Sequence, residues 1–203
     1  YVSNSPDATF FHHLAWREVL RGQPGVDPIY LLSRDGDAVC GVFPLCIQRS
    51  VLTSRLVSLP YCSYGGPLAS TPAAERRLIE ESLCIQRRLK AKSVLIKCRS
   101  FSQAACSLGF GADSSRERSV VDLSKSKDPW GRVKKKCRKA IRASIRRGVT
   151  VVESRGKNDM GDLFRLYLLT CKKHGMPPLS PRFFVRLSSV LGDTFKVFFA
   201  EYE

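Results

Sequence analysis

Two neighbouring apolar runs and the turn between them constrain the fold of this chain most. Residues 29–33 and 38–47 are rich in aliphatic and β-branched side chains, and the link between them contains Asp35-Gly36. An Asp-Gly pair between two such runs is a strong signal for a β-hairpin, because glycine adopts the backbone conformation that a tight turn needs. The sequence therefore predicts an antiparallel strand pair early in the chain.

Helix-like and strand-like segments alternate along the rest of the chain. Several predicted helices begin at a capping residue followed by proline, as at Thr71-Pro72, or end at glycine. The helices are expected over residues 12–21, 72–91, 103–108, 129–147, 159–174 and 181–191, and further strands over 55–59, 93–97, 118–123, 149–153 and 194–202. This alternation predicts an α/β protein with a mixed sheet and flanking helices.

The positive charge is concentrated in one segment. The 203 residues include 34 Lys and Arg against 18 Asp and Glu, a net charge of +16. Nine bases and no acid lie in residues 132–147, so the rest of the chain carries only +7. The same segment has an apolar stripe at helical spacing, formed by Val133, Cys137, Ala140, Ile141 and Ile145.

A helix with this charge has two interpretations. It can be a solvated face, although such faces usually mix acids with bases in i,i+4 pairs. It can also bind an anionic partner: the pyrophosphate of a nucleotide- or lipid-linked sugar, the acceptor stem of a tRNA, or an anionic membrane surface. Sequence-specific DNA binding is disfavoured, because no recognition-helix motif accompanies the charge.

The remaining composition excludes several classes of protein. No apolar run approaches the ~20 residues that cross a bilayer, so no transmembrane segment is expected. The eight cysteines are scattered without a C-x-x-C pair, which favours reduced, buried thiols and a cytoplasmic location over a disulfide scaffold, and predicts no metal site.

Four local patterns together resemble a known family. They are Ala8-Thr9-Phe10-Phe11-His12 with Trp16; Leu59-Pro60 through Tyr64-Gly65-Gly66-Pro67-Leu68; Trp130 with Arg138-Lys139-Ala140-Ile141-Arg142 and Gly148-Val149-Thr150-Val151; and Leu163-Phe164-Arg165-Leu166-Tyr167 with Gly175-Met176-Pro177 and Phe183-Phe184. In this order they resemble the Fem family of aminoacyl transferases and its peptidoglycan-bridge and exopolysaccharide acyltransferase relatives.

The resemblance implies two tandem folds of the N-acetyltransferase type (GNAT-like). Residues 1–148, with the basic helix 129–147, would form the first, and residues 149–203 would begin the second without completing it. It also implies an acyl or aminoacyl transferase of the bacterial cell envelope, acting on a peptidoglycan precursor or an exopolysaccharide. The donor, aminoacyl-tRNA or acyl-CoA, would engage the missing part of the second fold, so no cofactor is expected in this part.

The loop 61–67 is the best candidate for an acceptor pocket. Gly65 and Gly66 let the backbone approach a ligand closely, and Tyr64 can stack on a sugar or donate a hydrogen bond. The competing interpretation is an ordinary connection held by an aromatic side chain. Acceptor phosphate is expected on the bases Lys135, Arg138, Lys139 and Arg142. Arg17 is a further candidate, because the resemblance implies a phosphate-binding Lys near this position.

No catalytic residue can be assigned from the sequence. Asp113, Glu117 and Asp122 are possible bases, but capping and ion-pair roles are favoured for each. The three histidines, His12, His13 and His174, lie near helix ends, which favours capping or surface roles. The only glycine cluster near a donor-loop pattern, residues 108–112, is better explained as the end of a helix.

One interpretation from a different class remains open. The chain can be a catalytically inactive GNAT-like module that binds nucleic acid or an anionic envelope polymer through its basic helix. A transferase needs a donor site as well as this helix, so an assay for transfer separates the two.

Overall fold

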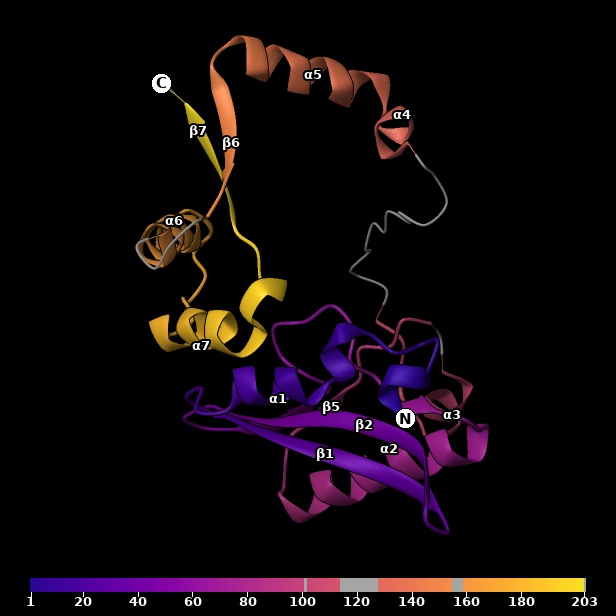
Figure 1. Ribbon diagram of the computed structural model, residues 1–203. Helices are drawn as coiled ribbons and strands as arrows, with labels where there is room; N and C mark the ends of the chain where they lie inside the picture. The colour runs from indigo at the N-terminus through magenta and orange to yellow at the C-terminus, as the bar shows by residue number, and fades with distance from the viewer. Residues whose placement is uncertain (101, 114–127, 155–158, 203) are drawn as a thin grey trace.

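The computed structural model describes residues 1–100, 102–113, 128–154 and 159–202 (Figure 1). Its first sheet contains β1 (Val26–Asp35), β2 (Ala38–Arg49), β3 (Ser54–Val57), β4 (Leu68–Ala69) and β5 (Val94–Leu95). The predicted hairpin is confirmed, since β1 and β2 are antiparallel and Asp35 pairs with Ala38 across a two-residue turn. The predicted strand 118–123 lies outside the described residues.

Strand β2 organises this mixed sheet. One of its edges pairs with β1 along most of its length. Its other edge pairs with β3 at residues 46–49 and with β4 at residues 41–42, and β5 runs parallel to β3. The chain leaves the sheet after β3 and returns at β4, so the segment 58–67 fills the gap between these two pairings.

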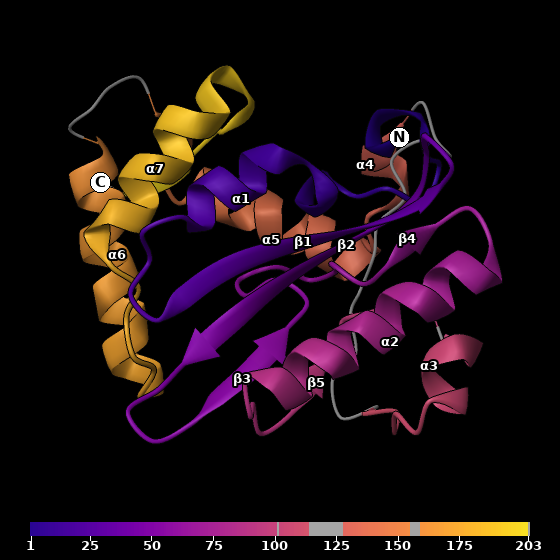
Figure 2. The same cartoon turned by 90° about the horizontal axis from the view of Figure 1, so that it is seen from below.

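Helices cover both faces of the sheet (Figures 1 and 2). Helix α1 (Leu14–Leu20) packs on one face with a core of Trp16, Val19 and Cys46. Helix α2 (Pro72–Arg88) packs on the other face, where its Leu78 and Ile85 meet Phe43, Leu45 and Leu56. The predicted N-cap is confirmed, because the Ala74 amide donates to Thr71 Oγ1 at 3.1 Å. Helix α3 (Gln103–Ser107) and the 3-10 helices η1 (Val2–Asn4) and η2 (Phe10–His12) flank this layer.

The single helix predicted over residues 129–147 is wrong: the segment forms α4 (Pro129–Arg132) and α5 (Lys135–Arg146). Val133 and Lys134 between them have extended backbone, with ψ of 129° and 139°. The Arg138 guanidinium donates to the carbonyls of Trp130 (3.4 Å) and Gly131 (3.2 Å). These carbonyls would otherwise accept from a continuing helix, so Arg138 stabilises the break.

The C-terminal part of the chain forms a second, separate sheet. Strands β6 (Val149–Glu153) and β7 (Phe198–Tyr202) are antiparallel, and α6 (Asp159–His174), α7 (Pro181–Leu191) and η3 (Gly192–Thr194) connect them. No strand is shared with the first sheet among the described residues. The division into a first fold at 1–148 and the start of a second at 149–203 stays a prediction.

Helix α7 attaches this C-terminal part to the first sheet layer. Phe183 on α7 is only 5% exposed and meets the Trp16 ring edge-on, with centroids 6.4 Å apart. The Tyr61 ring also meets the Phe183 ring, with centroids 5.5 Å apart. Arg186 donates through Nε (2.9 Å) and Nη2 (2.7 Å) to the carbonyl of Glu18, which extends the contact at its polar rim. An aromatic cluster thus joins segments about 170 residues apart in sequence.

Replacing Phe183 should weaken this attachment. We expect Phe183→Ala to lower the free energy of unfolding by about 3–5 kcal/mol, because it leaves a cavity between α7 and α1. Urea unfolding measures the loss. Phe198→Ala, which removes a 61% exposed ring from β7, is the control and should change the free energy by less than about 1 kcal/mol. Equal losses in the two variants would contradict the prediction.

The cysteines are all free, but only Cys46 and Cys171 are buried. The expectation of buried thiols is therefore wrong for the other six, of which Cys84, Cys106 and Cys137 are exposed. Cys46 lies on the α1 face of β2 in the apolar core. Burial raises the pKa of its thiol to about 12, and nearby Cys62 and Asp27 add to the shift.

This thiol should make the fold sensitive to alkali. The pKa of Cys46 in the folded protein lies above its ordinary value of 9.0, so folding favours the protonated thiol. The stability that this thiol contributes is therefore fully present below about pH 9. Between about pH 9 and 12 up to roughly 4 kcal/mol is lost. We expect Cys46→Ala to flatten the fall of unfolding free energy in this range. Cys106→Ala is the control, and an unchanged slope in Cys46→Ala would contradict the assignment.

Candidate functional site

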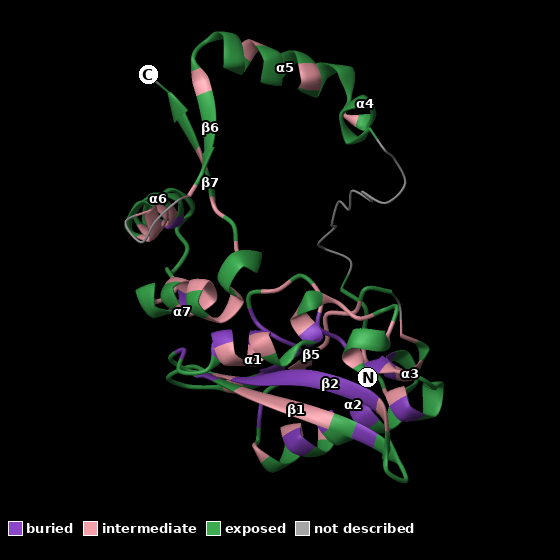
Figure 3. Cartoon of the chain, in the orientation of Figure 1, coloured by how far each residue is buried: buried purple, intermediate pink, exposed green. Residues whose placement is uncertain are grey.

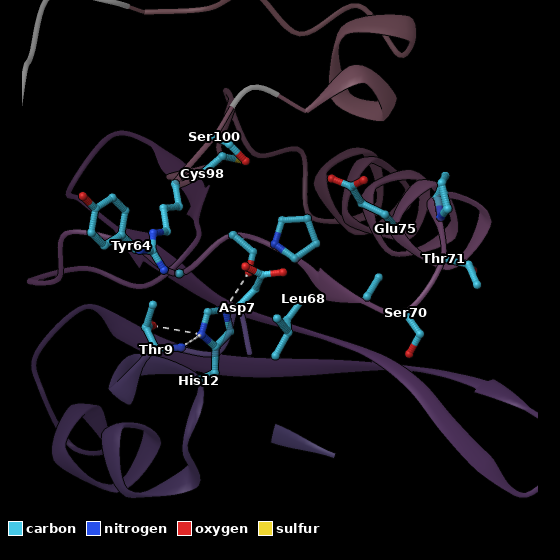
Figure 4. Close-up of a pocket in the computed structure, with 16 residues that line it drawn as sticks. Asp7, Thr9, His12, Tyr64, Leu68, Ser70, Thr71, Glu75, Cys98 and Ser100 are labelled. Carbon is cyan, nitrogen blue, oxygen red and sulfur yellow. Dashed lines mark hydrogen bonds between the residues drawn. The ribbon is translucent and has the colours of Figure 1, made fainter. Parts of the chain in front are cut away.

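A cavity of about 300 Å³ opens where the chain leaves the sheet between β3 and β4 (Figure 4). Three stretches of the chain line it, and the second of them runs from a loop into α2. They are the N-terminal Asp7, Thr9 and His12; the loop from Tyr64 to Ser70 with the start of α2, Thr71 and Glu75; and residues 98–100. The predicted pocket residues Tyr64, Gly65 and Gly66 all lie in this lining.

The loop before the cavity has a strained backbone that one lysine holds. Leu59 and Tyr61 have φ of 53° and 59°, in the left-handed region that non-glycine residues rarely adopt. The Lys97 ammonium donates to the carbonyls of Leu59 (2.9 Å) and Cys62 (3.2 Å). Its backbone amide donates to Ser58 Oγ at 2.7 Å. Lys97 thus provides a hydrogen-bond donor for the carbonyls of Leu59 and Cys62, which lie in the loop outside the sheet.

His12 fixes the opposite wall of the cavity. Its Nδ1 accepts from the Thr9 amide at 3.0 Å, so the ring proton resides on Nε2, which donates to the Gly66 carbonyl at 3.0 Å. The side chain is only 5% exposed. Both nitrogens are therefore used to position the loop. The expected capping role is also present, because Thr9 and His12 form a capping box at η2. His13 and His174 are exposed.

The two glycines of the loop serve close packing within the protein. A Cβ on Gly65 would lie 3.1 Å from the Ser58 carbonyl oxygen and 3.2 Å from Leu59. A Cβ on Gly66 would lie 3.1 Å from Cys98 Sγ. These contacts are tighter than a side chain normally allows. The glycines therefore let the loop lie against residues 58–59 and 97–98, and their predicted role in close approach to a ligand stays a prediction.

The charged groups of the cavity are mainly acidic. Asp7 and Glu75 supply two carboxylates and Arg99 one guanidinium. Ser102 donates a hydrogen bond to Glu75 at 2.7 Å. Burial, and to a smaller degree Glu75, raises the pKa of the Cys98 thiol, so this cysteine is protonated at neutral pH and is a weak nucleophile. This lining suits a polar organic group better than a cluster of phosphates.

The other predicted site residues lie elsewhere. Lys135, Arg138, Lys139 and Arg142 are on α5, which stands apart from the first sheet (Figure 1), and none of them lines the cavity. Arg17 is half-buried on α1, where its Nε has no hydrogen-bond partner among the described residues. Asp113 lines a second cavity, of about 590 Å³, beside β5. Glu117 and Asp122 lie outside the described residues.

Four residues of this site were not predicted from the sequence. They are Lys97, Glu75, Cys98 and, in its role as a buried side chain bonded to the Gly66 carbonyl, His12. Lys97 carried a usable signal, since a lysine that directly follows the apolar run Val94-Leu95-Ile96 needs acceptors nearby if its side chain turns inward. The helix stop expected at residues 108–112 is confirmed. The Gly109 amide donates to Cys106 and the Phe110 amide to Ala105, with a φ of 85° at Gly109. Within the described ranges, no group of His, Cys, Asp or Glu side chains could hold a metal ion.

Replacing Lys97 should loosen the wall of the cavity. We expect Lys97→Met to lower the free energy of unfolding by about 1.5–3 kcal/mol, because two carbonyls lose a charged donor while the apolar stem is kept. Lys92→Met, at an exposed lysine nearby, is the control and should change the value by less than about 0.5 kcal/mol. Chemical unfolding of both proteins tests this, and equal values would contradict the assigned role of Lys97.

We compared the chain with protein-family models, curated proteins and solved structures. No family model matches the chain, and no curated protein matches it. Solved structures do match, and the fold they define is Fem-type, with a GNAT-like mixed sheet and flanking helices. One of them, the crystal structure of FemX, aligns with the whole chain at a TM-score of 0.63 and 16% sequence identity. The chain spans 55% of that FemX chain. The expected Fem-type fold, with its mixed sheet and flanking helices, is thereby confirmed, whereas its division into two tandem folds stays a prediction.

Proposed function

We propose that this chain is the acceptor-binding part of an acyl or aminoacyl transferase of Fem type. The observation that carries the proposal is the alignment of the whole chain with FemX. The acceptor is a cell-envelope precursor, either a peptidoglycan precursor or an exopolysaccharide, carried on a nucleotide or a lipid. The reaction takes place in the cytoplasm, and its donor, aminoacyl-tRNA or acyl-CoA, binds in a part of the protein that this chain does not include.

The cavity beside β4 is the part of the chain that we assign to the acceptor. Tyr64 offers a ring and a hydroxyl at its wall, and Asp7 and Glu75 offer acceptors for the hydroxyl or amino groups of a sugar or peptide. His12 and Lys97 hold the loop from either side, so the wall is pre-formed before a ligand binds. The phosphate-binding role of Lys135, Arg138, Lys139, Arg142 and Arg17 stays a prediction.

Direct transfer makes modest chemical demands on such a site. The acceptor amine or hydroxyl must be held next to the activated acyl carbon, and its proton must pass to a base as the new bond forms. Holding the acceptor against a pre-formed wall supplies the first of these requirements. The chain contributes positioning, and no residue of the cavity is assigned as the base.

The full-length protein tests this proposal. We expect it to transfer labelled amino acid from aminoacyl-tRNA, or a labelled acetyl group from acetyl-CoA, to a nucleotide- or lipid-linked precursor. Tyr64→Ala should raise KM for the acceptor roughly tenfold, the cost of about 1.4 kcal/mol of lost contact. Tyr202→Ala, which changes a 73% exposed tyrosine on β7, is the control. Absence of transfer with both donors would overturn the proposal.

A second candidate function follows from α5. This helix carries no acid and no buried residue, and it stands apart from the first sheet (Figure 3). An inactive module that binds nucleic acid or an anionic polymer needs no more than this. It would show salt-dependent binding of the polymer and no transfer in the assay above.

A further inference from the structure

The surface formed by α4 and α5 has two chemically distinct sides. Lys135, Lys139, Arg142 and Arg146 follow one another at spacings of four, three and four residues, and so share one side of α5. Cys137, Ile141 and Ile145 follow at spacings of four and share another side. The whole segment 132–147, which includes the residues that flank α5, contains no acid. The helix is therefore amphipathic, with a purely cationic polar side.

The apolar side of α5 is exposed in the described structure. Ile141 is 41% and Ile145 63% exposed, and no residue of α5 is buried. Figure 3 shows the helix exposed or half-buried along its length, and Figure 1 shows it away from the first sheet. Among the described elements, α5 has its main contact with the neighbouring β6, and Arg138 and Arg142 reach back to α4.

Helix α4 adds an aromatic ring to the same surface. Trp130 is 40% exposed, and the Arg142 guanidinium lies 6.0 Å from its ring centroid. Arg138 fixes the corner through its bonds to the Trp130 and Gly131 carbonyls. A tryptophan beside arginines is the composition of helices that lie in the interface of a bilayer, where the ring sits among the headgroups.

The combination of charge and exposed apolar side chains selects the partner. A polyanion such as RNA would neutralise the bases and leave Ile141 and Ile145 in water. An anionic bilayer accepts both sides at once, since phosphate headgroups meet the bases while the aliphatic side chains enter the boundary below them. At 12 residues, α5 is about 18 Å long, too short to cross the hydrocarbon core. No helix in the described ranges is long and apolar enough to do so.

We propose that α4 and α5 bind the surface of an anionic phospholipid bilayer, with α5 lying flat in the interface. The helix then attaches the protein where lipid-linked molecules are displayed. The inference does not depend on the proposed transferase activity, because membrane binding is measured without donor or acceptor. The two proposals can therefore fail separately.

Vesicle sedimentation of the full-length protein tests the proposal. Vesicles of phosphatidylglycerol mixed with phosphatidylcholine should bind it at least roughly tenfold more tightly than pure phosphatidylcholine, and added salt should weaken the binding. Ile141→Ser with Ile145→Ser should lower the affinity roughly tenfold, since two aliphatic side chains no longer enter the boundary. Lys139→Glu with Arg146→Glu should do the same, because repulsion replaces attraction.

Two matched double variants control for exposed side chains in general. Val51→Ser with Leu52→Ser changes aliphatic side chains that are 99% and 91% exposed in the loop between β2 and β3. Arg87→Glu with Arg88→Glu changes two exposed bases at the end of α2. Both should leave vesicle binding within about twofold of the parent, since neither touches α5. A tenfold loss of vesicle binding in the Val51→Ser, Leu52→Ser variant would overturn the assignment to α5.

Two further outcomes would contradict the proposal. Binding that survives the Ile141 and Ile145 changes while remaining salt-sensitive would show a polyanion site, as would tighter binding to RNA than to vesicles. The emission of Trp130, obtained as the difference between the parent and Trp130→Phe, should shift to shorter wavelength on phosphatidylglycerol vesicles. An unchanged emission would show that this surface stays in water or is covered by another part of the protein.

Discussion

Burial of β2 on both of its faces is the constraint on which the rest of the fold depends. Seven consecutive residues, 41–47, are buried, so the strand needs an apolar cover on each side. Helix α1 supplies one cover and α2 the other. Because side chains alternate along a strand, Cys46 faces α1 while Phe43 and Leu45 face α2, and a single strand thereby fixes two cores.

The same strand creates the candidate site. Its outer edge pairs with β3 near one end and with β4 near the other, and the chain between them must leave the sheet and return. That path has positive φ angles at Leu59 and Tyr61, and the Lys97 ammonium bonds the carbonyls of Leu59 and Cys62 beside them. The His12 ring bonds the same segment farther along, at the Gly66 carbonyl. The cavity lies beside this detour. Its walls are set by the pairing of the sheet, which suits a site that must hold a ligand in one position.

The charge of the protein is separated from this site. The cavity contains two carboxylates and one guanidinium, whereas nine bases lie in the segment of α4 and α5. The proposed acceptor site and the proposed membrane-binding surface are thus two different regions of the chain. Phe183, which attaches α7 to α1, belongs to neither region and links the C-terminal part to the first sheet layer.

The sequence by itself determined the fold class and those elements whose ends are marked by local signals. The Asp35-Gly36 turn, the Thr71 cap and the stop at Gly109 were predictable because each depends on neighbouring residues only. Tertiary structure alone decided what meets at the cavity. His12 and Gly66 are 54 residues apart, and Lys97 reaches Leu59 across 38, contacts that no local pattern encodes. The structure also shows that the helix predicted over 129–147 breaks at Val133, where bonds from Arg138 to the two preceding carbonyls stabilise the break. It shows as well that Ile141 and Ile145 on the apolar side of α5 are exposed.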